Sequence, residues 1–439
     1  MMMRALFAAL GTVLLVTAAS VAGAQDTTGV RLGLTYAGGV KPGVIVLPVH
    51  DDFDDSLRVI VTRDFDYSDR LNAIMLDNVT LSGLVPPAGG TPDYAVVGKF
   101  GASLLVHMVP TGTGLQVSAY DVAGKKLLQA EHFLFDRRDR DWRFALHGIS
   151  DEVEKWVFGK RGIAQTRIAY IADGTLRIVD SDGAVTRTVT TGRGALSPAW
   201  SPTGESIVFT VLGNQGTQVQ QLDVRTGRTQ RISQIQTGLN ITPIYQPDGN
   251  GILYAQGTGN GTDLILASLD TNARRRITLG RGTDNTNPSY SPDGRQIAFI
   301  SGKSGQPQVY IMDADGSNVE LLTAYRPGVR SYRSSPDWSP DGRFITYQQQ
   351  MGDFQIWMMD LRDRIPKQLT SEAENEDPSW APDSRHIVFA STRSRQKQLW
   401  VMDTESGRMR QLTRTPGARL ASWSPTLVNP EIGNYSQDR

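Results

Sequence analysis

The sequence predicts a small α/β domain followed by an all-β, six-bladed β-propeller, and three observations lead to this fold class. A motif of the form Pro-x-aromatic-Ser-Pro-Asp-Gly recurs from Pro198 onward. Strand-like segments fill the interval between its copies. The first half of the chain alternates apolar runs with helical patterns instead. The repeat is the strongest of these signals, because a repeated unit buries its apolar face only against its neighbours and so determines the whole architecture.

The repeat has a nearly constant period. The second proline of the motif falls at positions 202, 247, 292, 340, 382 and 425, with steps of 45, 45, 48, 42 and 43 residues. A period of this length is typical of propellers and related repeat folds. The copies are Pro198–Gly204, Pro243–Gly249, Pro288–Gly294, Pro336–Gly342, Pro378–Ser384 and the shortened Ser422–Thr426.

Each unit contains four short strand-like segments. In the clearest unit, Pro288–Ile300 (PSYSPDGRQIAFI) supplies two strands joined by a tight turn. Pro presets φ in that turn, Asp caps its own backbone, and Gly accepts the strained exit. Gln308–Asp313 and Val319–Thr323 supply the third and fourth strands. Four antiparallel strands per period indicate a propeller blade.

The two ends of the repeat complete each other. Ile168–Ala172, Leu176–Asp180 and Thr186–Thr190 resemble the later strands of a blade, but no Pro-x-Trp strand precedes them. Trp423-Ser424-Pro425 is a first strand with no later strands after it. We therefore expect six blades over residues 164–427, with a C-terminal strand that closes the first blade and removes the free sheet edge.

Residues 43–160 predict a separate α/β domain. A buried strand is expected at Val44–Val49, and apolar residues at helical spacing predict helices at Asp55–Phe65 and Asp141–Phe158. One helix on each side of a small mixed sheet would suit a domain of this length. The other expected strands are Asn72–Leu76, Tyr94–Val97, Leu104–Val109, Leu115–Tyr120 and Leu127–Phe135.

The N-terminus predicts export. Arg4, the apolar stretch Ala5–Ala19 and the small-x-small site Ala22–Ala24 form a signal peptide over residues 1–24, so Gln25 would begin the mature chain. A membrane anchor is the alternative, although the apolar stretch is short for a membrane span. No later stretch reaches the length of a span, so no direct membrane insertion is expected. Residues 428–439 form a C-terminal tail.

Composition and motifs predict neither nucleic-acid binding nor catalysis. The 45 basic and 45 acidic side chains leave no surplus of charge for nucleic acid. The chain has no cysteine, no Gly-x-Ser-x-Gly nucleophile motif and no histidine pair at metal-binding spacing. We therefore expect no catalytic residue, no metal site and no cofactor.

Polar residues just before three of the first strands predict a binding site. They are Thr286, Asn287, Arg333, Ser335, Glu376 and Asp377. Loops in that position emerge on one face of a propeller around its central channel, so these residues are expected to converge at the channel mouth. The alternative is a set of solvated loops without a ligand. A polar ring at one mouth is in either case a hypothesis about binding and not evidence of chemistry.

The segment 25–42 allows two interpretations. It is rich in glycine but contains Gln25, Val30, Arg31, Leu32 and Leu34 in its first part. Composition alone favours a short edge strand with a linker. The alternative is an exposed peptide that docks on a partner by strand addition.

The chain resembles the TolB family, the periplasmic propellers of the Tol–Pal cell-envelope system. The resemblance rests on an α/β domain before six blades with Ser-Pro-Asp-Gly turns, and on the closing Trp423-Ser424-Pro425. Its most specific part is the junction His147–Ile171 (HGISDEVEKWVFGKRGIAQTRIAYI). Asn287 departs from the family, which often has an acidic residue there, whereas Glu376 and Asp377 keep the acidity one blade later.

The resemblance implies a non-catalytic periplasmic scaffold that maintains outer-membrane integrity during cell division. It implies that the peptidoglycan-associated lipoprotein Pal binds at the propeller mouth, and that a TolA-like inner-membrane protein binds the mature N-terminus. Two other functional classes are alternatives. A peptidase of the prolyl-oligopeptidase type is not expected, because only 14 residues follow Pro425. A propeller that senses a small ligand or glycan in its channel stays open.

Overall fold

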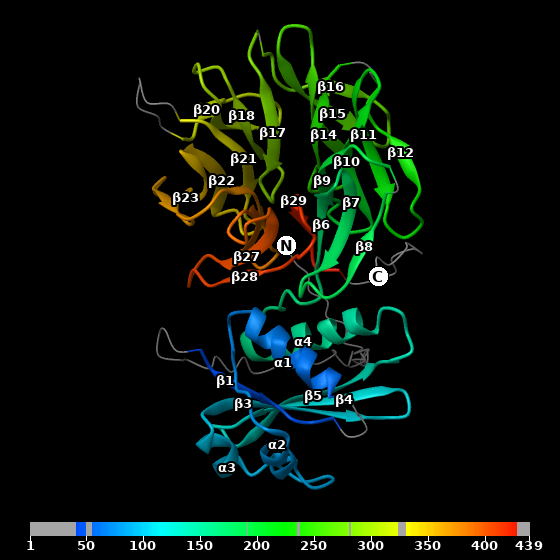
Figure 1. Cartoon of the computed structure of the whole chain (residues 1–439), viewed down its shortest axis with the longest axis vertical. Coiled ribbons are helices and arrows are strands. Elements are labelled where there is room, and N and C mark those ends of the chain that lie inside the picture. The colour runs from blue at the N-terminus through cyan, green and yellow to red at the C-terminus, as the bar shows by residue number, and fades with distance from the viewer. Residues whose placement is uncertain are drawn as a thin grey trace, which may run out of the picture. The chain divides into compact units, whose positions relative to one another are not determined.

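The computed structural model describes residues 41–49, 55–190, 192–234, 238–280, 282–323 and 331–427. Figure 1 shows these residues as a coloured ribbon. The predicted signal peptide, Gln25, Val30, Arg31, Leu32 and Leu34 all lie outside the described residues, as does the tail at 428–439. Expectations about these segments therefore stay predictions.

The N-terminal region forms a mixed five-stranded sheet with the order β2-β1-β3-β4-β5. Strand β1 lies between β2 and β3 and is parallel to both, and β3, β4 and β5 form an antiparallel meander. All four residues of β1 are buried, as its continuous apolar run predicts. The strands are β1 (Gly43–Val46), β2 (Asn72–Ala73), β3 (Ala102–Pro110), β4 (Gly114–Asp121) and β5 (Lys126–Leu134).

Helices cover both faces of this sheet, but the two predicted helices share one face. α1 (Ser56–Tyr67) and α4 (Trp142–Phe158) pack into the same apolar core with alternate residues of β1 and β3. The opposite face packs against α2 (Asn78–Leu84) and α3 (Tyr94–Lys99). The predicted strand at Tyr94–Val97 is wrong, because the Asp93 carboxylate accepts the backbone N–H groups of residues 95 and 96 and starts a helix there.

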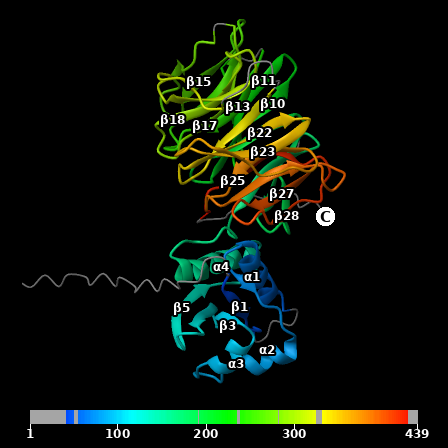
Figure 2. The same ribbon diagram turned by 90° about the vertical axis from the view of Figure 1, so that its left-hand side faces the viewer.

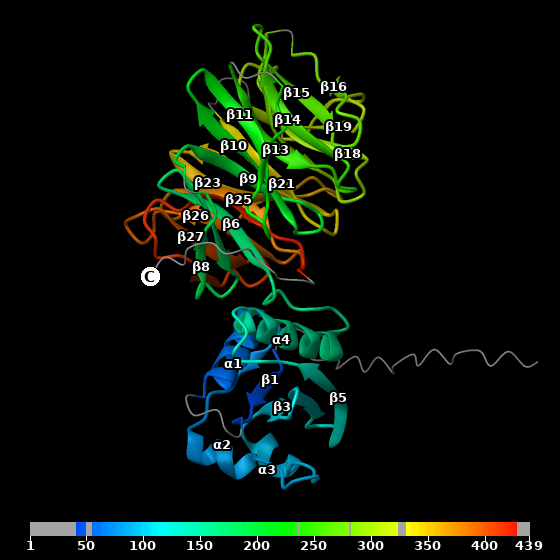
Figure 3. The ribbon, with the colours of Figure 1, turned by 90° about the vertical axis from the view of Figure 1, so that its right-hand side faces the viewer.

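The C-terminal region forms six four-stranded antiparallel sheets, which Figure 2 and Figure 3 show as the blades of a propeller. Blade 1 consists of β29 (Arg419–Trp423), β6 (Arg167–Ala172), β7 (Thr175–Asp180) and β8 (Thr186–Thr188). Blade 2 consists of β9 (Ala195–Trp200), β10 (Ser206–Gly213), β11 (Gly216–Asp223) and β12 (Thr229–Arg231). Blade 3 consists of β13 (Asn240–Tyr245), β14 (Gly251–Gly257), β15 (Thr262–Ser268) and β16 (Arg274–Arg276).

The remaining blades follow the same plan. Blade 4 consists of β17 (Asn285–Tyr290), β18 (Gln296–Ser301), β19 (Gln308–Asp313) and β20 (Glu320–Leu321). Blade 5 consists of β21 (Arg333–Trp338), β22 (Phe344–Met351), β23 (Asp353–Asp360) and β24 (Pro366–Gln368). Blade 6 consists of β25 (Asn375–Trp380), β26 (His386–Ser391), β27 (Gln398–Asp403) and β28 (Met409–Gln411).

The C-terminal strand closes the first blade, as the sequence predicts. β29 pairs with β6, and Trp423 lies opposite Ile168. The indole N–H of Trp423 donates to Thr166 Oγ1 at 2.8 Å, and the backbone N–H of Ser424 donates to the Arg167 carbonyl at 2.8 Å. These bonds join positions more than 250 residues apart, so the ring closes without an unpaired inner strand.

The junction motif makes buried polar contacts. His147 on α4 is fully buried, with Nδ1 2.8 Å from Asp64 Oδ2 on α1 and Nε2 3.5 Å from Asp182 Oδ2 in the turn after β7. Asp151, also on α4, accepts the backbone N–H groups of Ala164 and Gln165 at 2.8 and 2.9 Å. Polar side chains of α4 therefore fix the segment that leads into the first blade.

Candidate binding site in the propeller channel

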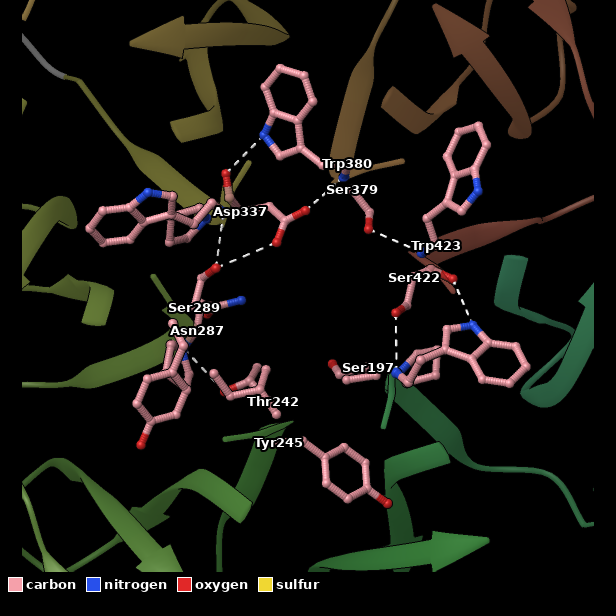
Figure 4. Close-up of a pocket in the computed structure, with 18 of the residues that line it drawn as sticks. Ser197, Thr242, Tyr245, Asn287, Ser289, Asp337, Ser379, Trp380, Ser422 and Trp423 are labelled. Atoms are coloured by element: carbon pink, nitrogen blue, oxygen red, sulfur yellow. Dashed lines mark hydrogen bonds between the residues drawn. The ribbon is translucent and has the colours of Figure 1, made fainter. Parts of the chain in front are cut away.

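The inner strands of the six blades surround a cavity of about 420 Å³. Figure 4 shows its lining side chains arranged in a ring. Each blade contributes the same motif positions, because the first strand of every blade runs along the channel. The volume lies within the range of about 300–1,000 Å³ that small-ligand pockets occupy. The channel is therefore large enough to receive part of a ligand or partner.

One ring of lining residues has a strained backbone. The six residues occupy the same position in each first strand and have φ values from 45° to 54°. The strand register shifts at each of them, which marks a β-bulge. Non-glycine residues in this region of φ carry strain that is often kept at functional sites. We call them the bulge ring: Ser197, Thr242, Asn287, Ser335, Asp377 and Leu420.

Hydrogen bonds join members of the bulge ring across blades. The Asn287 N–H donates to Thr242 Oγ1 at 3.1 Å. Asp377 accepts from the Ser335 hydroxyl at 3.2 Å and from the Leu420 N–H at 3.3 Å. One carboxylate thus connects three neighbouring inner strands, so this part of the bulge ring helps to hold the blades together.

A second ring lies two residues further along each first strand, at the x of Pro-x-aromatic. It consists of Ala199, Ile244, Ser289, Asp337, Ser379 and Ser422, which we call the belt. The four polar members each accept the backbone N–H of the tryptophan in the next blade. The distances are 3.0 Å for Ser289 with Trp338, 2.7 Å for Asp337 with Trp380, 3.1 Å for Ser379 with Trp423, and 3.4 Å for Ser422 with Trp200.

Burial raises the pKa of both carboxyl groups that line the channel. Burial raises the pKa of Asp337 to about 7, although the Trp380 N–H and the Ser289 hydroxyl favour the charged form. Burial and the nearby Glu376 raise the pKa of Asp377 to about 6. Among the residues that the structure describes, no lysine, arginine or histidine lines the cavity. The channel therefore presents two carboxyl groups whose hydrogen-bond donors are neutral.

The structure brings half of the sequence-predicted mouth residues into the channel. Asn287, Ser335 and Asp377 line the cavity. Thr286 is half-buried on β17 and does not belong to the lining. Glu376 forms an ion pair with Lys397.

Arg333 has a different environment from the one that the sequence suggests. Its side chain is buried, donates to Gln349 Oε1 at 3.0 Å and contacts Gln308 of the preceding blade. Burial lowers the pKa of its guanidinium, against the opposing effect of Tyr347. The contacts of Arg333 therefore connect two blades.

The sequence analysis missed the belt. Asp337 carries the only carboxyl group among its six positions, and Ser289, Ser379 and Ser422 are its polar neighbours in the ring. A signal was present, because the residue between proline and the aromatic ring holds the same place in every copy of the motif. A comparison of that one position along the repeats would have singled out Asp337.

The described residues contain no group of three or more His, Asp or Glu side chains placed to hold a metal ion. Within the ranges that the structure describes, no helix is both long and apolar enough to cross a membrane.

The chain is similar to known proteins. The family model of the TolB β-propeller domain matches residues 154–427, which is more than half of the chain. The Tol-Pal system protein TolB of Gluconobacter oxydans is 32% identical over 162 residues. That of Polaromonas naphthalenivorans is 28% identical over 169 residues. The matched regions cover 34% and 36% of this chain and 35% and 39% of these relatives, so the chain spans little more than a third of their length.

A solved structure extends the similarity to most of the chain. The crystal structure of TolB from Acinetobacter baumannii superimposes with a TM-score of 0.77 at 25% sequence identity. The match covers 88% of this chain and 97% of that structure, so it includes residues outside the propeller. The fold, the junction motif and the matched propeller lead to one conclusion: this chain belongs to the TolB family of the Tol-Pal system.

Proposed function

We propose that the chain is a non-catalytic scaffold of the periplasm that joins two partners of the Tol-Pal system. Its propeller mouth would bind the peptidoglycan-associated lipoprotein Pal. Its segment from Gln25 to Leu34 would bind a TolA-like inner-membrane protein. Such a bridge would maintain outer-membrane integrity during cell division.

The bulge ring is the observation that carries the proposal for the mouth. Six strained residues line one channel, and a scaffold holds such strain only where its surroundings fix it. Asn287, Ser335 and Asp377 of the proposed contact set belong to this ring. A ring with five polar members around a cavity would suit a protein partner that inserts one or two side chains.

The alternative, a sensor for a small ligand or glycan, requires aromatic rings that face the channel. Figure 4 shows Trp380, Trp423 and Tyr245 extending away from its centre. These rings are buried and pack in the apolar clusters between blades. The inner surface instead presents hydroxyl and carboxyl groups, which favours a polar partner over a stacked sugar ring.

Calorimetric titration of the mature chain from Gln25 with the soluble domain of Pal from the same organism tests the mouth. We expect saturable binding that weakens when Glu376 is replaced by lysine, because the rim then loses an acidic group beside the channel. Glu376→Lys is preferable to a change at Asp377, since Asp377 holds three inner strands together.

Glu320→Lys is the matched control. Glu320 forms a comparable ion pair with Arg364, but it lies on the outer strand of blade 4. Its replacement should leave the affinity for Pal unchanged. Absence of any binding by the unmodified chain would refute the proposed function. Equal affinity of the unmodified chain and both variants would show that Pal does not contact the propeller at Glu376.

A deletion tests the second partner. Removal of residues 25–34 should abolish binding to the soluble C-terminal part of TolA from the same organism and leave binding to Pal intact. Retention of TolA binding by the shortened chain would refute the role proposed for this segment.

A further inference from the structure

The channel beneath the mouth contains an unusual combination of groups. Asp337 is the one acidic residue among six equivalent belt positions, and it lies in the lining together with Asp377. Figure 4 shows the Asp337 carboxylate on the inner side of the ring, near the hydroxyls of Ser289 and Ser379. Serine occupies the belt position in three other blades and already accepts the tryptophan N–H there. The belt therefore does not require a carboxylate for its structure.

The hydrogen-bond partners of the two carboxylates are neutral. Asp337 accepts from the Trp380 N–H and from the Ser289 hydroxyl, and Asp377 accepts from the Leu420 N–H and the Ser335 hydroxyl. Lys397 acts on Asp377 through its charge, but it is already paired with Glu376. Buried charges are normally paired with an opposite charge, so the channel is complementary to one added cation.

The shape and chemistry of the cavity distinguish between kinds of cation. Calcium takes six to eight oxygen ligands, and most oxygen atoms of the belt and bulge ring are engaged in hydrogen bonds between blades. A primary ammonium needs only three acceptors and arrives on an alkyl stem. The lining offers such a stem apolar contacts, because Ala199 and Ile244 occupy two adjacent belt positions and prolines flank them.

We propose that the channel is a binding site for the ammonium group of one lysine side chain, which the protein that covers the mouth inserts toward Asp337. This inference rests on the proposed function, because Pal is the partner that would supply the lysine. It adds to that function the chemical group that is recognised and the residue that recognises it.

The proposal makes binding depend on pH in a defined direction. Burial raises the pKa of Asp337 to about 7, so part of the free protein is protonated at neutral pH. An inserted ammonium group would favour the ionised carboxyl and release a proton on binding. Affinity should therefore rise between about pH 6 and pH 8, as Asp337 becomes charged without the partner.

The test compares three chains by calorimetric titration with the soluble domain of Pal. Asp337→Ser introduces the serine that is found at three other belt positions, and the serine hydroxyl keeps an acceptor for the Trp380 N–H. It should weaken binding by about tenfold or more, the usual effect of losing a hydrogen bond to a charged group. Asp353→Asn removes one exposed carboxyl from the same blade, away from the channel, and should leave the affinity unchanged.

Acetylation of the lysines of Pal provides the second arm. Acetylated Pal should bind the unmodified chain more weakly than Pal does. The affinity for Asp337→Ser should change little on acetylation, because both changes remove the same contact. The proposal is overturned if Asp337→Ser binds Pal as tightly as the unmodified chain does, while the unmodified chain binds. It is equally overturned if acetylation of Pal lowers the affinity for the unmodified chain and for Asp337→Ser to the same degree.

A divalent cation is the other possible occupant of the channel, and a separate measurement distinguishes it from a lysine side chain. If calcium chloride raises the melting temperature of the unmodified chain but not that of Asp337→Ser, and acetylated Pal binds normally, the channel is a metal site and the lysine proposal is wrong. If the unmodified chain does not bind Pal at all, the proposed function itself fails.

Discussion

The carboxylate of Asp337 accepts the backbone N–H of Trp380 from the next blade at 2.7 Å. The same Trp380 returns a bond, since its indole N–H donates to the Asp337 carbonyl at 3.2 Å. Two residues from different sheets thus hold each other through both backbone and side chain. The inner edge of the propeller is therefore a ring of bonds between blades as well as a channel wall.

The raised pKa of Asp337 makes stability depend on pH. A carboxyl whose pKa is higher in the folded chain than in the unfolded chain favours folding when protonated, and this contribution is lost as pH rises from about 4 through about 7. Asp337→Asn stays neutral and keeps an acceptor oxygen. Relative to the unmodified chain, its free energy of unfolding should therefore increase between about pH 4 and pH 7.

Denaturant unfolding at several pH values measures this difference. Asp353→Asn serves as the control, because its exposed carboxyl should give a difference that hardly changes with pH. A difference for Asp337→Asn that is flat with pH would show that the Asp337 carboxyl is not destabilised in the channel.

Trp380 is expected to be a main contributor to propeller stability. It is 4% exposed, packs with Ile387 and Phe389, and stacks on Phe344 of the preceding blade with ring centres 6.1 Å apart. Trp380→Ala should lower the free energy of unfolding by about 3–5 kcal/mol, because it leaves a large cavity. Val319→Ala, at an exposed position, should change it by less than about 0.5 kcal/mol. A loss below about 1 kcal/mol in denaturant unfolding would mean that the ring is not part of the core.

The sequence could predict the propeller because its evidence is local and repeated. The turn of Pro288–Gly294 recurs in four other blades with small changes, and an aromatic residue equivalent to Tyr290 recurs in all six. The incomplete ends at Ile168 and Trp423 imply the closure. In contrast, the short run at Tyr94–Val97 fits a strand or a helix equally well, and the Asp93 cap decides between them.

The site was harder to predict than the fold because its contacts are distant in sequence. Asp377 lies in an acidic run that resembles a solvated face, but it bonds to Ser335 and Leu420, which are 42 and 43 residues away. Arg333 also looks like a free cation in the sequence, whereas the structure buries it against Gln308 and Gln349. Neither role follows from composition or spacing.

His147 should stabilise the chain mainly in its charged form. Burial alone would lower its pKa, but the carboxylates of Asp64 and Asp182 outweigh burial and raise the pKa to about 10. Stability from a raised histidine pKa is fully present below about pH 6.5 and is lost as pH rises through the folded value. The destabilisation caused by His147→Gln should therefore be largest near pH 6 and shrink toward about pH 10.

His107→Gln is the control for this prediction. His107 lies on β3, and burial lowers its pKa without an acidic partner. Its replacement should give no such decline between about pH 7 and pH 10. A constant destabilisation by His147→Gln over that range would show that the charge of His147 does not contribute.

Closure of the first blade gives the last prediction. β29 supplies the inner strand of that blade, and Trp423 donates to Thr166 Oγ1 in a buried position. A chain that ends at Gly417 should lose its single cooperative unfolding transition and associate in solution, because β6 and the adjoining inner strands then have free edges. Size-exclusion chromatography and denaturant unfolding measure both effects.

Thr166→Val separates closure of the blade from this single contact. It leaves a buried indole N–H without its acceptor and should lower the free energy of unfolding by about 1–3 kcal/mol, while the chain stays monomeric. A shortened chain that remains monomeric and equally stable would show that β29 is dispensable for closing the ring.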